Sequence, residues 1–267
     1  MAGDHLPEDL SRITDAEALG LFRGLTRVFA EPQGITEGVA HLDEAQAGHL
    51  SRVLRKNPGD PVGVLDGAGN GWLARLESCS KRSASARLLR AVPNPDLALR
   101  GVEIAIGPLK GDRMDLVLQK CTEMGVCRFH IVPFERGVAR VRADEAKQAR
   151  YRAILRAAAR QCGAFTIPDV RIWKDIEAFF QSALPPLRYL AWEEEAAVPA
   201  SAIVEGSDPC VLATGPEGGL SAPEAALWVR GGFQTVSLGQ RVLRAETAPI
   251  VMAGLALCAR ALPTAAP

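Results

Sequence analysis

Hydrophobic and polar positions follow one pattern up to about residue 93 and a different one after it. In the first part the apolar runs are short and typical of strands, and they lie at residues 27–30, 62–65 and 72–76. In the second part strand-like runs alternate with helical spacings, and they lie at residues 102–106, 129–132, 189–192, 210–213 and 235–238. The pattern predicts a mostly β part followed by an α/β part, with a parallel sheet covered by helices on both faces.

Capping signals mark several helix boundaries. Asp43, with Gln46 three positions on, is a predicted N-cap for a helix inside the β-rich part. Ser221 and Glu224 have the spacing of a capping box and begin a predicted short helix. The longer predicted helices of the α/β part lie at residues 112–124, 144–162 and 246–261.

The expected linker is residues 92–96, because two prolines two positions apart disfavour both a helix and a central strand. Residues 1–24 are polar and acidic, so we expect them to form an N-terminal extension. The expected division is therefore an extension at 1–24, a β domain at 25–93 and an α/β domain at 94–267.

Composition excludes several classes of protein. The 267 residues include 31 Lys+Arg and 31 Asp+Glu, a mixture that is neither disordered nor fibrous. No apolar run is long enough to span a bilayer, and the acids Asp4, Glu8 and Asp9 argue against a secretory signal, so we expect no membrane partner and a cytoplasmic protein. The cysteines and histidines are scattered singly, which predicts neither a metal site nor a disulfide framework.

The balance of charge is uneven along the chain. Between residues 136 and 160 Lys and Arg strongly outnumber the two acids, Asp144 and Glu145. Such a run is either a solvated helix face or a surface that binds a polyanion.

Two glycine clusters have different meanings. Gly67, Gly69 and Gly71 are followed by a strand-like run rather than a helix, so a hairpin turn explains them better than a dinucleotide site. Residues 214–221 directly follow a predicted strand, at the sheet edge where α/β proteins bind ligands. Their three glycines let backbone groups approach a ligand, although an ordinary strand-to-helix turn is the alternative.

A second loop, at residues 238–248, follows the last predicted strand. It places Arg241 and Arg244 at the same edge of the sheet as the glycine-rich loop. The two loops together predict a composite pocket.

Specific motifs in both parts resemble one family. They are GPEGG at 215–219, LGQRVLRAETA at 238–248, KGDRM at 110–114, KCTEMGV at 120–126, ER at 135–136, HLSRVLR at 49–55 and DG at 66–67. In this order they resemble the bacterial 16S rRNA uridine-N3 methyltransferase family, of the knotted SPOUT class. The resemblance covers the chain from about Arg27 to the C-terminus.

This resemblance implies a PUA-like β-barrel followed by a SPOUT α/β domain tied in a trefoil knot. It also implies a homodimer, S-adenosylmethionine as methyl donor, and one uridine of 16S rRNA, in the decoding region of the small ribosomal subunit, as substrate. Two alternatives are a non-catalytic RNA-binding factor for ribosome assembly with the same fold, and a knotted methyltransferase that acts on tRNA.

The resemblance also suggests roles for single residues. Glu217 is expected either to accept the uridine imide proton or to hold the loop, and Arg244 either to stabilise the developing oxyanion or to contact a phosphate or a partner subunit. The expected cofactor-binding residues are Leu190, Thr214, Gly215, Gly219, Leu238, Gly239, Leu243 and Thr247. The expected RNA-binding residues are Arg27, Arg52, Arg55, Lys56, Lys110, Arg113, Arg136 and Arg140.

One helix end departs from the family. The family usually has a Glu near the position of Ala157 and an Arg near that of Ala164. Either a paired interaction is lost here as a unit, or contacts to RNA have shifted.

Overall fold

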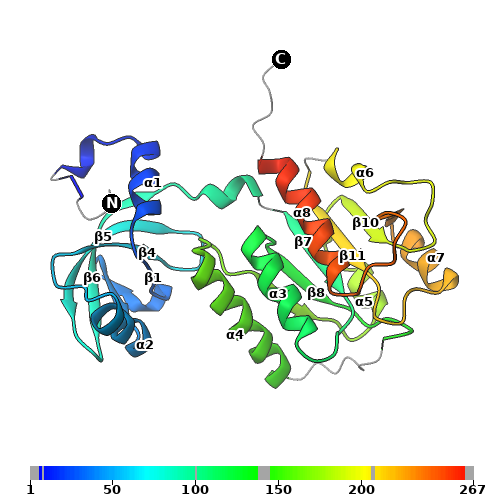
Figure 1. Ribbon diagram of the computed structural model, residues 1–267, viewed down its shortest axis with the longest axis horizontal. Coiled ribbons are helices and arrows are strands. Elements are labelled where there is room, and N and C mark those ends of the chain that lie inside the picture. The colour runs from blue at the N-terminus through cyan, green and yellow to red at the C-terminus, as the bar shows by residue number, and fades with distance from the viewer. Residues whose placement is uncertain (1–5, 8, 100, 138–144, 206–207, 262–267) are drawn as a thin grey trace, which may run out of the picture. The chain divides into compact units, whose positions relative to one another are not determined.

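The computed structural model describes residues 6–7, 9–99, 101–137, 145–205 and 208–261. The chain forms two compact units (Figure 1). The first comprises the described residues up to Pro95 together with Ala159–Ile167, and the second comprises the described parts of Asp96–Ala158 and of the chain from Pro168 onward. The segment Ala159–Ile167 therefore lies outside the unit in which the expected boundary at residue 93 would place it.

The first unit is built on a six-stranded sheet in the order β1-β4-β5-β6-β3-β2. Its strands are β1 (Arg27–Phe29), β2 (Ile35–Thr36), β3 (Val39–Leu42), β4 (Pro61–Leu65), β5 (Gly71–Cys79) and β6 (Ala84–Val92). Short 3-10 turns of this unit are Leu10–Arg12 and Pro32–Gly34, and the turn Pro95–Leu99 begins at Pro95 and continues into the second unit. The hairpin prediction is confirmed, because β4 and β5 pair in antiparallel register from Pro61↔Arg75 to Leu65↔Gly71.

Residues 15–24 are not an extension. They form helix α1 (Asp15–Gly24), which begins at a capping box between Thr14 and Glu17. Ala18 and Phe22 are buried in one core cluster with strand residues of the sheet, including Leu65. Weak helical periodicity hid this role, since only these two side chains of the helix are fully buried.

The helix expected after Asp43 is short and changes its winding. Asp43 caps α2 (Glu44–Gly48), which continues directly into a π-helical turn at His49–Val53. Arg55 lies beyond that turn with φ +53°. Arg52 and Arg55 therefore do not share a helical face, because the helical winding ends before residue 55.

The second unit contains a six-stranded sheet in the order β12-β10-β11-β7-β8-β9. All five neighbouring pairs are parallel, as predicted. The strands are β7 (Val102–Ile106), β8 (Arg128–Ile131), β9 (Asp169–Ile172), β10 (Leu187–Ala191), β11 (Cys210–Thr214) and β12 (Gln234–Val236). The helices are α3 (Arg113–Met124), α4 (Glu145–Cys162), α5 (Ile176–Phe180), α6 (Ser201–Val204), α7 (Ala222–Arg230) and α8 (Thr247–Ala261).

Helices cover both faces of this sheet, which confirms the second part of the prediction. On one face Ala105 and Val211 pack in a cluster that includes Phe179 of α5 and Trp228 of α7. On the other face α8 contacts β7 and β11 and packs against α3. The knotted threading of this domain stays a prediction.

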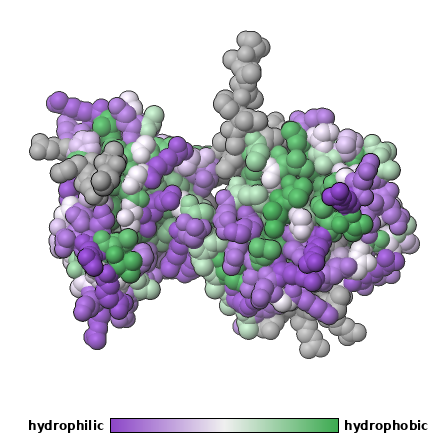
Figure 2. Space-filling model, viewed as in Figure 1, coloured by the Kyte–Doolittle hydropathy of each residue, from purple (hydrophilic) through white to green (hydrophobic). Residues whose placement is uncertain are grey.

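The outer surface of α8 remains hydrophobic. Val251 is 37% exposed, and hydrophobic side chains gather over this helix in Figure 2. No helix in the described part of the chain is long and apolar enough to cross a membrane.

Candidate functional site

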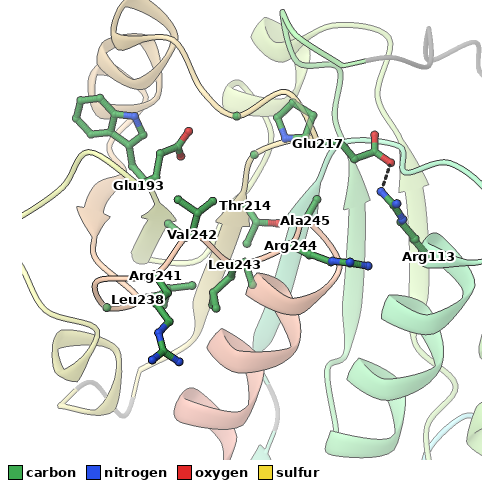
Figure 3. Close-up of a pocket in the computed structure, with 17 residues that line it drawn as sticks. Arg113, Glu193, Thr214, Glu217, Leu238, Arg241, Val242, Leu243, Arg244 and Ala245 are labelled. Atoms are coloured by element: carbon green, nitrogen blue, oxygen red, sulfur yellow. Dashed lines mark hydrogen bonds and ion pairs between the residues drawn. The ribbon is translucent and has the colours of Figure 1, made fainter.

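Three neighbouring strands of the second unit end at one cavity of about 490 Å³ (Figure 3). The loops after β10, β11 and β12 supply most of its lining, because the carboxyl ends of parallel strands lie at the same edge of a sheet. Its lining residues are Arg113, Ala191, Trp192, Glu193, Thr214, Gly215, Pro216, Glu217, Gly219, Leu238, Gly239, Arg241, Val242, Leu243, Arg244, Ala245 and Ala248. The composite pocket expected from the two loops is therefore present.

Most of the expected cofactor-binding residues line this cavity. They are Thr214, Gly215, Gly219, Leu238, Gly239 and Leu243. Leu190 does not, because its side chain is fully buried in the hydrophobic core on one face of the sheet. Thr247 is also absent from the lining, and its backbone N–H donates to the carbonyl of Arg244.

Glycine at position 219 is required by the backbone. Gly219 has φ +68°, and a Cβ there would collide with the Glu193 carboxylate. The Glu193 Oε1 atom also accepts a hydrogen bond of 3.4 Å from the backbone N–H of Leu220. The glycine-rich loop therefore passes close to the segment after β10.

The cavity offers an unused polar group. The Thr214 side chain is buried, and its hydroxyl has no hydrogen-bond partner among the described residues. Buried polar atoms are normally satisfied, so an unpartnered hydroxyl in the wall of a cavity indicates that a ligand completes it.

Two carboxylates and two guanidinium groups lie along one side of the cavity. Glu217 Oε1 accepts from the backbone N–H of Lys110 at 3.1 Å and from Arg113 Nη1 at 3.3 Å. The Glu246 carboxylate lies 3.9 Å from Arg113 Nε and 3.9 Å from Arg244 Nη1. Figure 3 shows Glu193 on the side of the cavity away from the Glu217–Arg113 pair. Arg244 is 79% exposed in its side chain, so its charge remains accessible to a substrate.

A second cavity, of about 590 Å³, adjoins this charged side. It is lined by Lys110, Gly111, Asp112, Arg113 and Glu217, so it shares Arg113 and Glu217 with the first. Two of the expected RNA-binding residues, Lys110 and Arg113, therefore lie next to the expected cofactor site.

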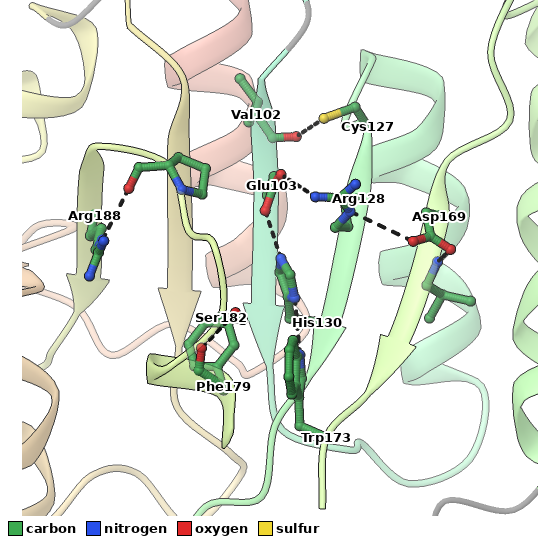
Figure 4. Close-up of polar contacts among 12 residues, drawn as sticks. Val102, Glu103, Cys127, Arg128, His130, Asp169, Trp173, Phe179, Ser182 and Arg188 are labelled. Carbon is green, nitrogen blue, oxygen red and sulfur yellow. Dashed lines mark hydrogen bonds and ion pairs between the residues drawn. The ribbon is translucent and has the colours of Figure 1, made fainter. Parts of the chain in front are cut away.

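A separate polar group crosses the same sheet (Figure 4). Trp173 Nε1–H donates to His130 Nδ1 at 3.0 Å, which places the His130 proton on Nε2, where it donates to Glu103 Oε2 at 2.7 Å. Arg128 binds the other oxygen of Glu103 at 3.0 Å. Each buried partner is satisfied by the others, so this group stabilises the sheet and lines neither cavity.

Comparison with protein families now identifies the fold. Residues 96–257 match the model of an RNA methyltransferase domain, and residues 42–89 match that of an RNA methyltransferase PUA domain. The chain belongs to this RNA methyltransferase family. The PUA-like first domain and the α/β second domain implied by the resemblance are both confirmed.

Individual relatives of the methyltransferase are similar over most of their length. A ribosomal RNA small subunit methyltransferase E of Synechocystis is 33% identical over 92% of this chain and 81% of its own. One of Bacillus subtilis is 30% identical over 76% of this chain and 83% of its own. The crystal structure of the same enzyme from Neisseria gonorrhoeae, bound to S-adenosyl methionine, superposes with a TM-score of 0.71 at 28% identity, covering 86% of this chain and 95% of that one.

The other expected RNA-binding residues that the structure describes line neither of the two cavities. Arg27, Arg52, Arg55 and Lys56 belong to the first unit, and Arg136 follows β8. The Arg27 guanidinium lies against Gly163, where a Cβ would be 2.5 Å from its Nη1. Arg140 lies outside the described residues.

Sequence reasoning missed several residues of the cavity. They are Ala191, Trp192, Glu193, Pro216, Val242, Ala245 and Ala248. Trp192 is the last residue of the strand predicted at 189–192 and Glu193 follows it, so their position at the carboxyl end of that strand was the available signal.

Proposed function

We propose that this methyltransferase transfers a methyl group from S-adenosylmethionine to N3 of one uridine in the decoding region of 16S rRNA. The observation that carries the proposal is the cavity where the glycine-rich loop after β11 meets the arginine-bearing loop after β12. The names of the relatives support a small-subunit rRNA substrate, and the resemblance of the motifs supports the uridine and its N3 atom.

The residues of the cavity fit this cofactor. Its volume of about 490 Å³ lies in the range typical of small-molecule sites. Gly215, Gly219 and Gly239 leave backbone groups accessible, and the unpartnered hydroxyl of Thr214 offers a hydrogen bond. When bound, S-adenosylmethionine supplies a methyl group activated by a sulfonium. Thr247 and Leu190, expected to bind it directly, would support the site from helix α8 and from the core.

Two side chains would then act on the uridine. Glu217 is only 17% exposed, and its Oε2 has no hydrogen-bond partner among the described residues, so none of their donors would compete with the N3 proton for this oxygen. Arg244 would stabilise the negative charge that develops on the neighbouring carbonyl oxygen. The alternative role of Glu217, holding the loop, is supported by its two contacts through Oε1.

The adjoining cavity is suited to the RNA backbone. Lys110 and Arg113 present positive charge where the two cavities meet. Arg136 and Arg140 would extend this contact in the second domain, and Arg27, Arg52, Arg55 and Lys56 would supply one in the first. A ribosomal substrate would place the enzyme in the cytoplasm.

The proposal includes a homodimer. On α8, Val251, Leu255 and Cys258 recur at the spacing of one helical face, and Val251 and Cys258 are exposed. Leu116 of the neighbouring α3 is 39% exposed as well. A second copy of the chain would cover this hydrophobic face, and light scattering at micromolar concentration measures whether it does.

The decisive experiment maps modified nucleosides in rRNA and tRNA from a deletion strain. Loss of one N3-methyluridine from 16S rRNA, restored by the wild-type gene, would establish the activity. Loss of a tRNA modification instead would establish the tRNA alternative. Calorimetry with S-adenosylmethionine tests the third alternative, because a non-catalytic assembly factor would not bind the cofactor.

A further inference from the structure

The loop after β8 is joined to the glycine-rich loop by three side chains. Ser221 Oγ donates to Glu135 Oε2 at 2.9 Å, and Glu224 Oε1 accepts from the backbone N–H of Glu135 at 2.7 Å. We propose that Glu135, Ser221 and Glu224, here called the Glu135 clasp, are positioning residues that hold the cavity wall at residues 215–220 and the Arg136 backbone in one arrangement. The inference rests on the proposed function, and it assigns a role to Glu135 of the ER motif, to which the proposed function gives none.

The direction of the Glu224 side chain supports this role. In a complete capping box the carboxylate of Glu224 would return to the backbone N–H of Ser221. Only half of the box forms, since Ser221 Oγ accepts from the backbone N–H of Glu224 at 3.3 Å while the carboxylate reaches Glu135 instead. Glu224 is only 6% exposed, and burying its carboxyl group costs free energy unless the group is hydrogen-bonded. The hydrogen bond to the loop after β8 offsets this cost.

The two loops also touch through their backbones. A Cβ on Gly218 would be 2.9 Å from the carbonyl oxygen of Arg136 and 3.0 Å from its Cβ. Glycine at this position therefore lets the loops approach more closely than any other residue would. Gly219, the next residue, lines the cavity.

The clasp consequently links two contacts that the proposed reaction needs together. One end carries the wall against which the cofactor binds, and the other carries Arg136, which is proposed to bind RNA. Because the clasp links the two loops, a ligand that favours one arrangement of the cavity wall also favours the matching arrangement of Arg136, so bound cofactor and bound RNA should favour each other.

The test compares Glu224→Ala with Glu224→Gln in the full-length protein. The glutamine keeps an oxygen that can accept from the backbone N–H of Glu135, and the alanine does not. We expect Glu224→Ala to weaken S-adenosylmethionine binding by about tenfold in calorimetry, and Glu224→Gln by less than about twofold. Bound cofactor should increase the affinity for a 16S rRNA fragment in the wild type and in Glu224→Gln, but not in Glu224→Ala.

A control separates positioning from general loss of stability. Val229 is a half-exposed residue of α7 outside the clasp, and Val229→Gly weakens that helix without touching Glu135 or Glu224. If Val229→Gly lowers Tm as much as Glu224→Ala does but leaves cofactor affinity unchanged, the clasp is supported. If Val229→Gly weakens cofactor binding as much as Glu224→Ala does, the clasp is overturned.

A second pair decides the matter if Glu224→Ala does not fold. Glu135→Ala removes the acceptor for Ser221, whereas Glu135→Gln preserves one, and neither change touches the core. Cofactor affinity that is weakened in the alanine variant and restored in the glutamine variant would support the clasp, and equal affinities would overturn it. A wild-type protein that does not bind S-adenosylmethionine would instead overturn the proposed function itself.

Discussion

Arg113 Nη1 donates to Oε1 of Glu217 across 3.3 Å, and this pair joins the first turn of α3 to the loop after β11. Both residues line the cavity of about 490 Å³ and the adjoining cavity of about 590 Å³. The pair therefore lies where the proposed cofactor site meets the proposed RNA site. Its chemistry can be tested by changes that alter proton transfer and loop position separately.

Glu217→Gln separates the two roles of this carboxylate. The amide oxygen can still accept from Lys110 and Arg113, so the loop should keep its position, but an amide cannot take a proton from uridine. We expect kcat to fall about 100-fold with cofactor affinity almost unchanged. Single-turnover methylation and calorimetry measure the two quantities.

Glu217→Ala is the companion variant, because it removes both functions. It should weaken cofactor binding as well as lower kcat. If Glu217→Gln instead retains nearly full kcat while Glu217→Ala loses cofactor affinity, Glu217 holds the loop and another group accepts the proton.

Gly219→Val should remove cofactor binding. Its side chain would collide with the Glu193 carboxylate at the cavity wall, and the residue would be strained at φ +68°. Gly59→Val is a matched control, because Gly59 has φ +98° with open space around it and lies in the first unit. Both variants should lose about 1 kcal/mol of unfolding free energy from the backbone alone, but only Gly219→Val should lose cofactor affinity. If calorimetry gives Gly219→Val and Gly59→Val the same affinity for S-adenosylmethionine, this loop is not part of the cofactor site.

Much of the second domain was predictable because its elements bury regular faces. The helix predicted at 112–124 is α3 (Arg113–Met124), and the strand predicted at 210–213 is β11 (Cys210–Thr214). Strand β6 (Ala84–Val92) was missed because its arginines and small residues give a weak β signal. Its backbone is held in a strand by antiparallel pairing with β5 and β3. Tertiary packing decided that element, as it decided α1.

The candidate site was predictable only in part. The loops after β11 and β12 carry glycines and arginines that mark them in the sequence. The segment after β10 begins the acidic run Glu193, Glu194 and Glu195, which has the composition of a solvated loop. It lines the cavity because β10 lies between β11 and β12, and the spatial order of strands cannot be read from local pattern.

Protonation of Glu224 should affect stability in a defined pH window. Burial raises the pKa of this carboxyl above the ordinary value of 4.5. The hydrogen bond from the backbone N–H of Glu135 opposes this rise, as does the charge of Arg136, whereas the Glu135 carboxylate adds to it. The folded state therefore binds this proton more tightly than the unfolded state does. The resulting contribution to the free energy of unfolding is complete below pH 4.5 and declines as the pH rises through the raised pKa. Relative to wild type, Glu224→Gln should gain unfolding free energy as pH rises above 4.5 and then level off. Urea denaturation from pH 4 to about pH 8 measures the difference, and a pH-independent difference would contradict the assignment.

Cysteine labelling tests the dimer. Burial raises the pKa of the Cys121 thiol to about 12, so this cysteine should stay unreactive in the folded protein. Cys258 is exposed on a single chain and shares the α8 face with Val251, so a dimer should protect it. We expect Val251→Glu to yield a monomer in light scattering and to accelerate labelling of Cys258 about tenfold, measured by peptide mass spectrometry. Fast labelling of Cys258 in the wild type would mean that α8 is not the interface.

Arg52 and Arg55 test whether the first domain binds RNA. Both side chains are exposed, and neither forms an ion pair with the described part of the chain. They therefore do not pair with Glu44 or Asp60, the surface acids that would have given them a purely structural role. Changing both to alanine should weaken binding to a 16S rRNA fragment and reduce its salt dependence by about two charges.

The matched control removes two arginines of the same domain that are already engaged. Arg87 pairs with Glu77 at 2.7 Å, and Arg75 donates to the carbonyl of Gly59 at 2.9 Å. Arg75→Ala with Arg87→Ala lowers the net charge equally, so a general electrostatic effect would reduce the salt dependence in both double variants. A direct phosphate contact reduces it only in Arg52→Ala with Arg55→Ala, and cofactor affinity stays unchanged because neither residue lines the cavity. Identical slopes for that variant and the wild type would show that the first domain binds RNA through other residues or not at all.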